Sequence, residues 1–307
     1  MLTSLLIRTR TFKAELPDTV NKFGYNACHA FHLRQSIMIQ LPYLSATRFF
    51  GPDAGSFLQA QLSADISALE DGQSTFAAYC SPQGKVFGLL LIGRHNDHYM
   101  VVGSAQLLPS IVHRLRIYIF RSKVEIKPLD KLQVCGVLPP HPDDPDDPAS
   151  PVFAPGSLPL RYTVVSEGTQ SDEATDRWRQ SELNHGVAWL DASTTEKFIP
   201  QMLGYDQLGA VSFTKGCYPG QEIVARTHYL GRVKRKPLLT TIVGQAVIEN
   251  GSRMQIQYAT ESVNGTLVDS APAGTENTLL FIITRVEDEK KPVSITHEDQ
   301  SYPSAIE

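Results

Sequence analysis

Hydrophobic positions in residues 38–138 alternate between strand-like and helix-like spacing. The pattern predicts strands at 44–50, 75–80, 85–92, 98–102, 124–126 and 132–137, a helix at 54–62 and a helix running into a strand over 105–120. Asp53 precedes the first helix and is expected to cap it. Ser81-Pro82-Gln83-Gly84 joins two of the strands and is typical of a hairpin turn. This order of elements predicts an α+β region and not a doubly wound one.

A second α+β region is expected over residues 160–236. It contains a predicted strand at 161–165 and a helix over 172–185, which Ser171 can cap and Gly186 can end. Between the two regions, residues 139–159 interleave prolines with aspartates. Proline removes backbone donors and like charges repel, so this segment is predicted to be a solvated loop and not a metal site.

The two ends of the chain differ from its middle. Short alternating strands over residues 237–288 predict a small β-barrel, and the polar residues 289–307 are expected to form a frayed tail. Residues 1–37 contain arginines and few acids, and no apolar core of a secretory signal follows them. They are read either as residues upstream of a natural start at Met38 or as an organelle transit peptide, and both readings leave them outside the fold.

Composition narrows the class of protein. The chain has 307 residues, with 28 Lys and Arg against 32 Asp and Glu, so no global basic excess drives nucleic-acid or membrane binding. The longest apolar stretch, Val86 to Ile92, is far shorter than the roughly 20 residues of a membrane span. These features exclude a transmembrane protein, a collagen, a coiled coil and a wholly disordered chain.

The four cysteines are scattered, and no two have C-x-x-C spacing. This spacing argues against a structural zinc site and against an iron–sulfur cluster held by this chain alone. A chain of this length buries its own core, so a disulfide scaffold is not expected either. The reducing cytosol is the expected compartment, or the mitochondrial matrix if residues 1–37 are a transit peptide.

The sequence KGCYPGQE, residues 215–222, combines two glycines and a proline, which predicts a tight loop. Good helix formers follow over residues 221–229, so Cys217 is expected on a loop before a helix N-terminus, with Lys215 nearby. The helix dipole and the ammonium both favour a thiolate, which makes Cys217 a candidate nucleophile. The alternative is that Cys217 is a small buried hydrophobe in a structural loop.

Five basic residues and no acid follow this loop. They are Arg226, Arg232, Lys234, Arg235 and Lys236. Such a run is often a solvated face, but beside a glycine-rich loop it favours binding of an anion, either a ligand carboxylate or an RNA backbone. Glu182 and Glu222 are weaker candidates for contact with a polar heterocycle, and Glu222 equally suits a helix start.

KGCYPGQEIVAR closely resembles the signature of the YgfZ family of folate-binding proteins. FIPQM, GAVSFTKGC, GPDAGSFLQAQLSADI and SPQGKVFGLLLI resemble other parts of the same family, and the N-terminal pieces also resemble the wider glycine-cleavage T-protein superfamily. The resemblance covers about residues 39–275. The motif residues are Lys215, Gly216, Cys217, Tyr218, Gly220, Gln221, Glu222 and Arg226.

The resemblance implies a T-protein-like ring of three domains, in which two related α+β domains hold a reduced folate and a small β-barrel closes the ring. It implies a tetrahydrofolate-binding accessory factor for iron–sulfur proteins, including radical tRNA-methylthiolating enzymes, with no cluster of its own. Expected partners are folate and client iron–sulfur proteins, with an indirect link to tRNA. Cys217 would be the reactive thiol, and Arg226 or Arg232 would face the glutamate tail of the folate.

One departure separates the chain from T-proteins. Those proteins carry paired aspartates shortly after the hairpin glycine, and one of them acts on the folate amine. Gly88 and Leu89 occupy these positions here, and neither can carry a proton. Aminomethyl transfer is therefore disfavoured, although a transferase with a diverged site and an RNA-binding factor both stay as alternatives.

Overall fold

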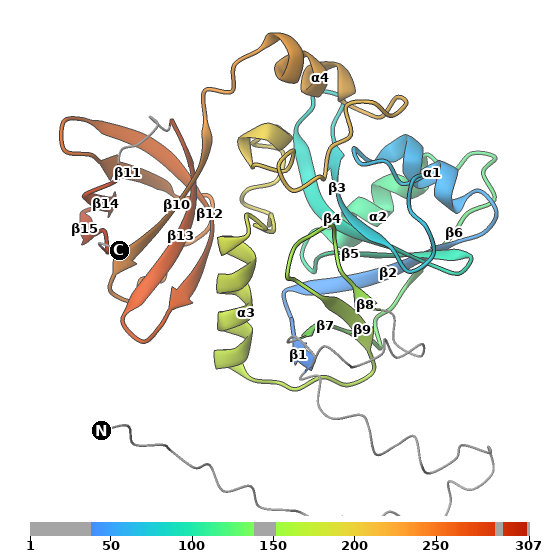
Figure 1. Ribbon diagram of the computed structural model, residues 1–307, viewed down its shortest axis with the longest axis horizontal. Coiled ribbons are helices and arrows are strands. Elements are labelled where there is room, and N and C mark those ends of the chain that lie inside the picture. The colour runs from blue at the N-terminus through green and yellow to red at the C-terminus, as the bar shows by residue number, and fades with distance from the viewer. Residues whose placement is uncertain (1–37, 138–151, 286–290, 306–307) are drawn as a thin grey trace, which may run out of the picture. The chain divides into compact units, whose positions relative to one another are not determined.

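The structure is a computed structural model that describes residues 38–137, 152–285 and 291–305 (Figure 1). Within these ranges the chain forms three antiparallel sheets and four α-helices, an α+β architecture. The expectations for residues 1–37 and for the aspartates of the 139–159 loop fall outside the described residues. None of the described helices is long and apolar enough to cross a membrane.

The five-stranded sheet confirms most of the elements predicted for the first region. Its order is β3 (Ser74–Cys80), β4 (Val86–His95), β5 (His98–Ser104), β2 (Leu44–Phe50) and β6 (Glu125–Pro128), with helices α1 (Ala54–Gln61) and α2 (Leu108–Ile117) beside it. The predicted hairpin joins β3 to β4. Residues 86–92 are all buried. Because successive side chains of a strand point to opposite faces, α2, which packs against β4 and β5, covers one set and the rest of the main core covers the other.

Two local expectations in this region are wrong. Asp53 does not cap α1, because its backbone is not in the extended conformation of a capping residue; its carboxylate instead accepts a hydrogen bond from the Lys123 amide at 2.7 Å. The helix predicted to continue into a strand ends at Ile117, and residues 118–124 form turns and irregular structure before β6. Phe120 is exposed there, so the apolar residues that suggested a strand are not all buried.

The four-stranded sheet combines strands that are distant in the sequence. Its order is β1 (Met38–Gln40), β7 (Gln133–Val137), β9 (Tyr162–Val165) and β8 (Val152–Phe153). It therefore takes strands from both expected α+β regions and from the loop between them. The helix α3 (Asp172–Asn184) begins as predicted, with the Ser171 hydroxyl accepting a hydrogen bond from the Ala174 amide. Trp178 of α3 is buried against Gly136 of β7, where an added Cβ would lie 2.5 Å from the indole.

The six-stranded sheet forms the C-terminal part of the fold. Its order is β10 (Lys236–Val243), β13 (Asn277–Thr284), β12 (Ser262–Ala273), β11 (Arg253–Gln257), β14 (Ser294–His297) and β15 (Gln300–Pro303). An isolated bridge joins Ile242 of β10 to Ser304, so the first and last strands of the sheet are hydrogen-bonded at one end. The sheet has its own apolar core, and α3 packs against β12, where Arg179 forms an ion pair with Asp269.

The expectation of a frayed tail after residue 288 is wrong for the part that the structure describes. β14 pairs with β11 and β15 pairs with β14. The hairpin is held because Ile295 is fully buried in the core of this sheet and Tyr302 packs against the same core. Every other residue of these strands is polar or proline, so the pattern carried only a weak strand signal.

Candidate functional site

The KGCYPGQE loop leads into α4 (Gln221–Leu230), as predicted. The backbone of Gly220 has a φ of +81°, a left-handed conformation that favours glycine. The Gly220 position also lies on the β3–β4 hairpin, since an added Cβ would lie 2.4 Å from the Ser81 carbonyl oxygen and 2.7 Å from the Gly84 Cα. The hairpin and the start of α4, two segments singled out separately in the sequence, therefore form one backbone-to-backbone contact.

The FIPQM segment supports this contact from the side. The Val86 amide, at the start of β4, donates a hydrogen bond to the Phe198 carbonyl at 2.9 Å. Gln201, in the short 3-10 helix η1 (Pro200–Met202), is buried and donates its side-chain amide to the Val224 carbonyl of α4 at 2.7 Å. The FIPQM segment is thus hydrogen-bonded both to the hairpin and to α4.

Lys215 makes contacts that the sequence did not predict. Its ammonium donates hydrogen bonds to the carbonyls of Gln59, Leu62 and Ala64 at 2.5, 2.7 and 2.8 Å. These carbonyls lie at the C-terminal end of α1, where backbone acceptors lack helical partners and a cation is favoured. Burial lowers the pKa of Lys215 to about 8, with a smaller opposing effect from Asp65. All three N–H groups are occupied, so Lys215 ties the motif loop to α1.

Cys217 is exposed, whereas the other two described cysteines are buried. Burial raises the pKa of Cys80 to about 12 and that of Cys135 to about 11. A thiol reacts through its thiolate, so both buried residues combine poor access with a low thiolate fraction. Cys217 is therefore the thiol that a ligand or partner protein can reach in the described part of the chain.

This contrast predicts one fast-reacting thiol. In a Cys28→Ser background, native protein mixed with a chromogenic disulfide reagent is expected to release one equivalent quickly, and two more only after unfolding in urea. Adding Cys217→Ser should remove the fast equivalent and leave the other two. Three equivalents released at one rate from native protein would contradict the burial of Cys80 and Cys135.

The remaining motif residues divide into a buried and an exposed group. The ring of Tyr218 is buried, with its centroid 5.5 Å from the Lys215 ammonium, and burial raises the pKa of Tyr218. Gln221 donates a long hydrogen bond of 3.4 Å to the Lys215 carbonyl. The structure leaves Glu222, Arg226 and Arg232 exposed on α4 and on the segment after it. The structure of the loop therefore depends on Lys215, Tyr218, Gly220 and Gln221. The exposed residues Glu222, Arg226 and Arg232 are the ones that a ligand or partner protein can contact.

Glu182 lies in the interior and not at the motif loop surface. Its carboxylate accepts hydrogen bonds from the Tyr43 hydroxyl at 2.7 Å, the Tyr162 hydroxyl at 2.8 Å and the Trp189 indole at 3.0 Å. Burial raises the pKa of Glu182 to about 7, and the three hydrogen bonds oppose that shift. Fully buried and partnered by the protein itself, Glu182 orders the core around α3.

Positions 88 and 89, where the family resemblance expects aspartates, both face packed side chains. Leu89 is 1% exposed and belongs to the main core. A Cβ added at Gly88 would lie 2.8 Å from the Ile111 Cδ1 of α2, so the helix packs directly on the strand there. Neither position offers an acid, and Leu89 leaves no room for one.

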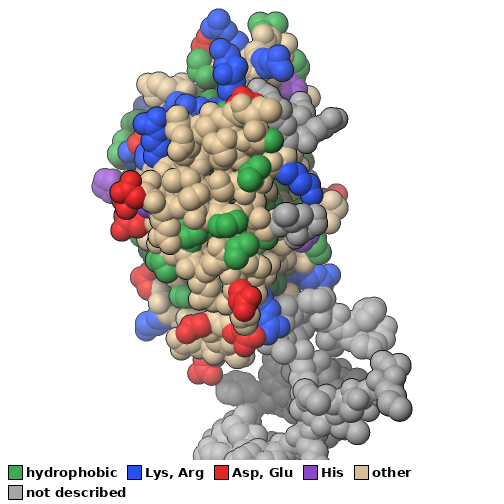
Figure 2. Space-filling model, turned by 90° about the vertical axis from the view of Figure 1, so that its left-hand side faces the viewer, with side chains coloured by type: hydrophobic (Ala, Val, Ile, Leu, Met, Phe, Trp, Pro, Cys, Tyr) green, Lys and Arg blue, Asp and Glu red, His purple; other side chains and the backbone are tan. Residues whose placement is uncertain are grey.

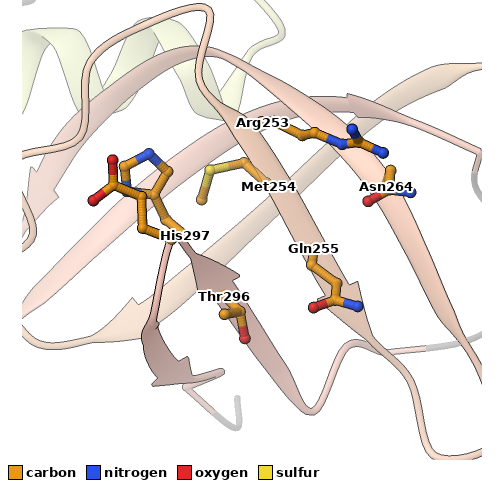
Figure 3. A pocket seen from close by; sticks show the side chains of 7 residues that line it. Arg253, Met254, Gln255, Asn264, Thr296 and His297 are labelled. Carbon is orange, nitrogen blue, oxygen red and sulfur yellow. The ribbon is translucent and has the colours of Figure 1, made fainter.

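Two surface hollows are described, and neither involves the motif. The larger, about 500 Å³, lies on the six-stranded sheet and is lined by Arg253, Met254, Gln255, Asn264, Thr296, His297 and Glu298 (Figure 3). The smaller, about 170 Å³, lies beside the start of α3. The residues predicted to bind folate line neither hollow, so the motif presents an exposed loop and helix.

This arrangement of sheets and helices is that of a known class of protein. The chain is similar to the glycine cleavage system aminomethyltransferase T from Bartonella henselae, with a TM-score of 0.62 over 87% of this chain and 84% of that one, at 13% identity. The fold is therefore that of an aminomethyltransferase T.

The sequence relatives are more specific. The tRNA-modifying protein YgfZ of Klebsiella pneumoniae is 32% identical over 237 residues, 67% of this chain and 72% of the relative. Its counterpart in Cronobacter sakazakii is 28% identical over 248 residues, 72% of this chain and 75% of the relative. No family model matches the chain. At this identity and coverage the chain belongs to the YgfZ family, which confirms the resemblance carried by the motif.

Proposed function

We propose that the protein is a folate-binding accessory factor that supports the assembly or repair of iron–sulfur proteins, including enzymes that modify tRNA. One observation carries this proposal. The chain has the fold of an aminomethyltransferase T, and its hairpin contacts the motif loop, while Gly88 and Leu89 stand where the family resemblance expects the acids of the transfer reaction. Such a protein retains a framework for a folate without the group that drives its chemistry.

The roles within the site follow from exposure. Cys217 is accessible and lies on the loop before α4. It would contact a client cluster or a one-carbon unit on the folate. Arg226 and Arg232 would hold the glutamate tail through charge-assisted hydrogen bonds. A closed C-terminal barrel and a three-domain ring belong to the same proposal, and the bridge between Ile242 and Ser304 supports the barrel.

Calorimetric titration with tetrahydrofolate tests the proposal. Wild-type protein is expected to bind saturably, and Arg226→Ala should weaken binding by about tenfold, the value of a charged hydrogen bond. Arg121→Ala, an exposed arginine after α2, is the matched control and should bind like the wild type. Absence of binding by the wild type would overturn the folate assignment, and equal binding by both variants would move the tail contact away from Arg226.

The competing function is a one-carbon transferase with a diverged site. It requires turnover of a methylamine donor in the presence of tetrahydrofolate. Because Gly88 and Leu89 supply no acid, we expect no turnover above the uncatalysed rate. Turnover that survives removal of Cys217 would favour the transferase instead.

A further inference from the structure

The C-terminal half of α4 carries a stacked group of aromatic rings. Phe213 and His228 stack with centroids 3.7 Å apart and planes 14° apart. Tyr229 meets both rings edge-on, at 6.3 Å from Phe213 and 4.8 Å from His228. Aromatic faces and edges grouped in this way can be extended by a further flat ring, such as a nucleobase.

This half of the helix is open to solvent. Val224 is the one buried residue of α4, whereas Tyr229 is 63% exposed and Leu230 is 86% exposed. These two neighbouring side chains add apolar surface beside the rings that another molecule could contact.

Three cations continue from the aromatic group. Arg232, Lys234 and Arg235 are exposed, and none of them forms an ion pair within the described part of the chain. Figure 2 shows Lys and Arg side chains gathered at the upper end of the face it views, level with α4 in Figure 1, and acidic side chains toward the lower end. The run 226–236 holds five of the 28 basic residues and none of the 32 acids. The rest of the chain is therefore more acidic than the chain as a whole. Positive charge is therefore concentrated beside the rings.

A second segment with exposed aromatic and basic residues provides a comparison. Phe120 is 83% exposed and follows two arginines of α2. Those arginines are engaged internally, since Arg114 packs on the Phe87 ring at 3.9 Å and faces Glu196, and Arg116 donates to the Ile126 carbonyl. Arg121, the residue after Phe120, is exposed, but Phe120 makes no ring contact within the described residues. The segment at α4 differs because three exposed cations lie beside a stacked group of rings, which favours α4 as the binding surface.

We propose that the α4 patch, defined as Phe213, His228, Tyr229, Arg232, Lys234 and Arg235, binds single-stranded RNA. A base would stack on the exposed aromatic group, and the three cations would contact successive phosphates. The pairing of stacking rings with a short basic strip suits a single strand, whose bases are free to stack, better than a duplex. This inference shares Arg232 with the proposed folate contact but uses neither Arg226 nor Cys217. Tyr229→Ala, which removes no proposed folate contact, separates the two proposals.

Fluorescence anisotropy with a labelled single-stranded RNA of about 12 nucleotides, and with the same strand paired to its complement, tests the proposal. Three phosphate contacts on a single strand predict that a rise from 50 to 200 mM salt weakens binding roughly 20-fold. Tyr229→Ala should weaken single-strand binding by between about fivefold and 100-fold, whereas Tyr229→Phe, which keeps the ring, should bind like the wild type. The double variant Arg232→Gln/Arg235→Gln should reduce the salt dependence to that of about one phosphate contact.

The matched control is Phe120→Ala/Arg121→Gln, which removes an equally exposed aromatic and basic pair elsewhere. It should bind RNA like the wild type. Thermal melting of every variant near the wild-type temperature excludes a loss of fold. The proposal is overturned if native protein shows no saturable binding at 50 mM salt, if the control pair weakens binding as much as the α4 variants, or if duplex binds as tightly as single strand. The first of these outcomes would favour a protein partner for the patch.

Discussion

Replacement of Lys215 by methionine is expected to lower the free energy of unfolding by roughly 3 kcal/mol. Methionine keeps the apolar length of the side chain but cannot donate, so it leaves the carbonyls of Gln59, Leu62 and Ala64 without their partner. A buried polar group left unsatisfied costs about 1–3 kcal/mol, and some of these carbonyls would gain water. Urea unfolding followed by circular dichroism measures the change.

The matched control is Lys85→Met. The Lys85 ammonium donates to a single carbonyl, that of Lys197, in a more exposed setting. Its replacement should cost less than about 1 kcal/mol. Equal losses for the two variants would show that the three carbonyls at the end of α1 do not depend on Lys215, and the role of this lysine would revert to chemistry at Cys217.

The second large effect is expected at Gly220. Gly220→Ala places a Cβ where the backbone of the β3–β4 hairpin already lies, in a left-handed conformation that alanine adopts at a cost of about 1–2 kcal/mol. The close atoms are backbone atoms of Ser81 and Gly84, which cannot rotate away. A loss of about 2–4 kcal/mol in the free energy of unfolding is therefore expected, together with weaker folate binding, because the loop must lift from the hairpin.

Gly216 supplies the control within the same loop. A Cβ added there meets no atom within 4 Å, and its φ is not in the left-handed region. Gly216→Ala should change the free energy of unfolding by less than about 0.5 kcal/mol. If both alanine variants unfold at the same urea concentration, the contact between the hairpin and α4 is not what fixes this loop.

The sequence correctly predicted those elements that form because of their own local residues. The hairpin at 81–84, α1, α3 with its Ser171 cap and the α4 segment all depend on local spacing and turn residues, and all are confirmed. The hairpin β14–β15 was missed because one buried isoleucine and a tyrosine secure two otherwise polar strands through pairing with β11. Pairing between distant strands leaves no trace in the spacing of either one.

The site shows the same division. The sequence correctly placed Cys217 on a loop before a helix. The basic residues after it are exposed, as a solvated face requires. The direction of Lys215 could not be predicted, because the acceptors that orient it lie about 150 residues earlier in the chain. The stacking of Phe213 on His228 was also missed. The two rings come from different elements, a loop and the helix that follows it, and the spacing within each element does not show that they meet.

The packing of α2 on β4 also limits which amino-acid substitutions positions 88 and 89 can accept. An aspartate at position 89 would place a carboxylate in a fully buried apolar core, at a cost of several kcal/mol. One at position 88 would have to displace the Ile111 side chain. Introduction of the acid at position 89 would thus meet a stability barrier before any activity could be selected, whereas position 88 needs only the end of a flexible side chain to move.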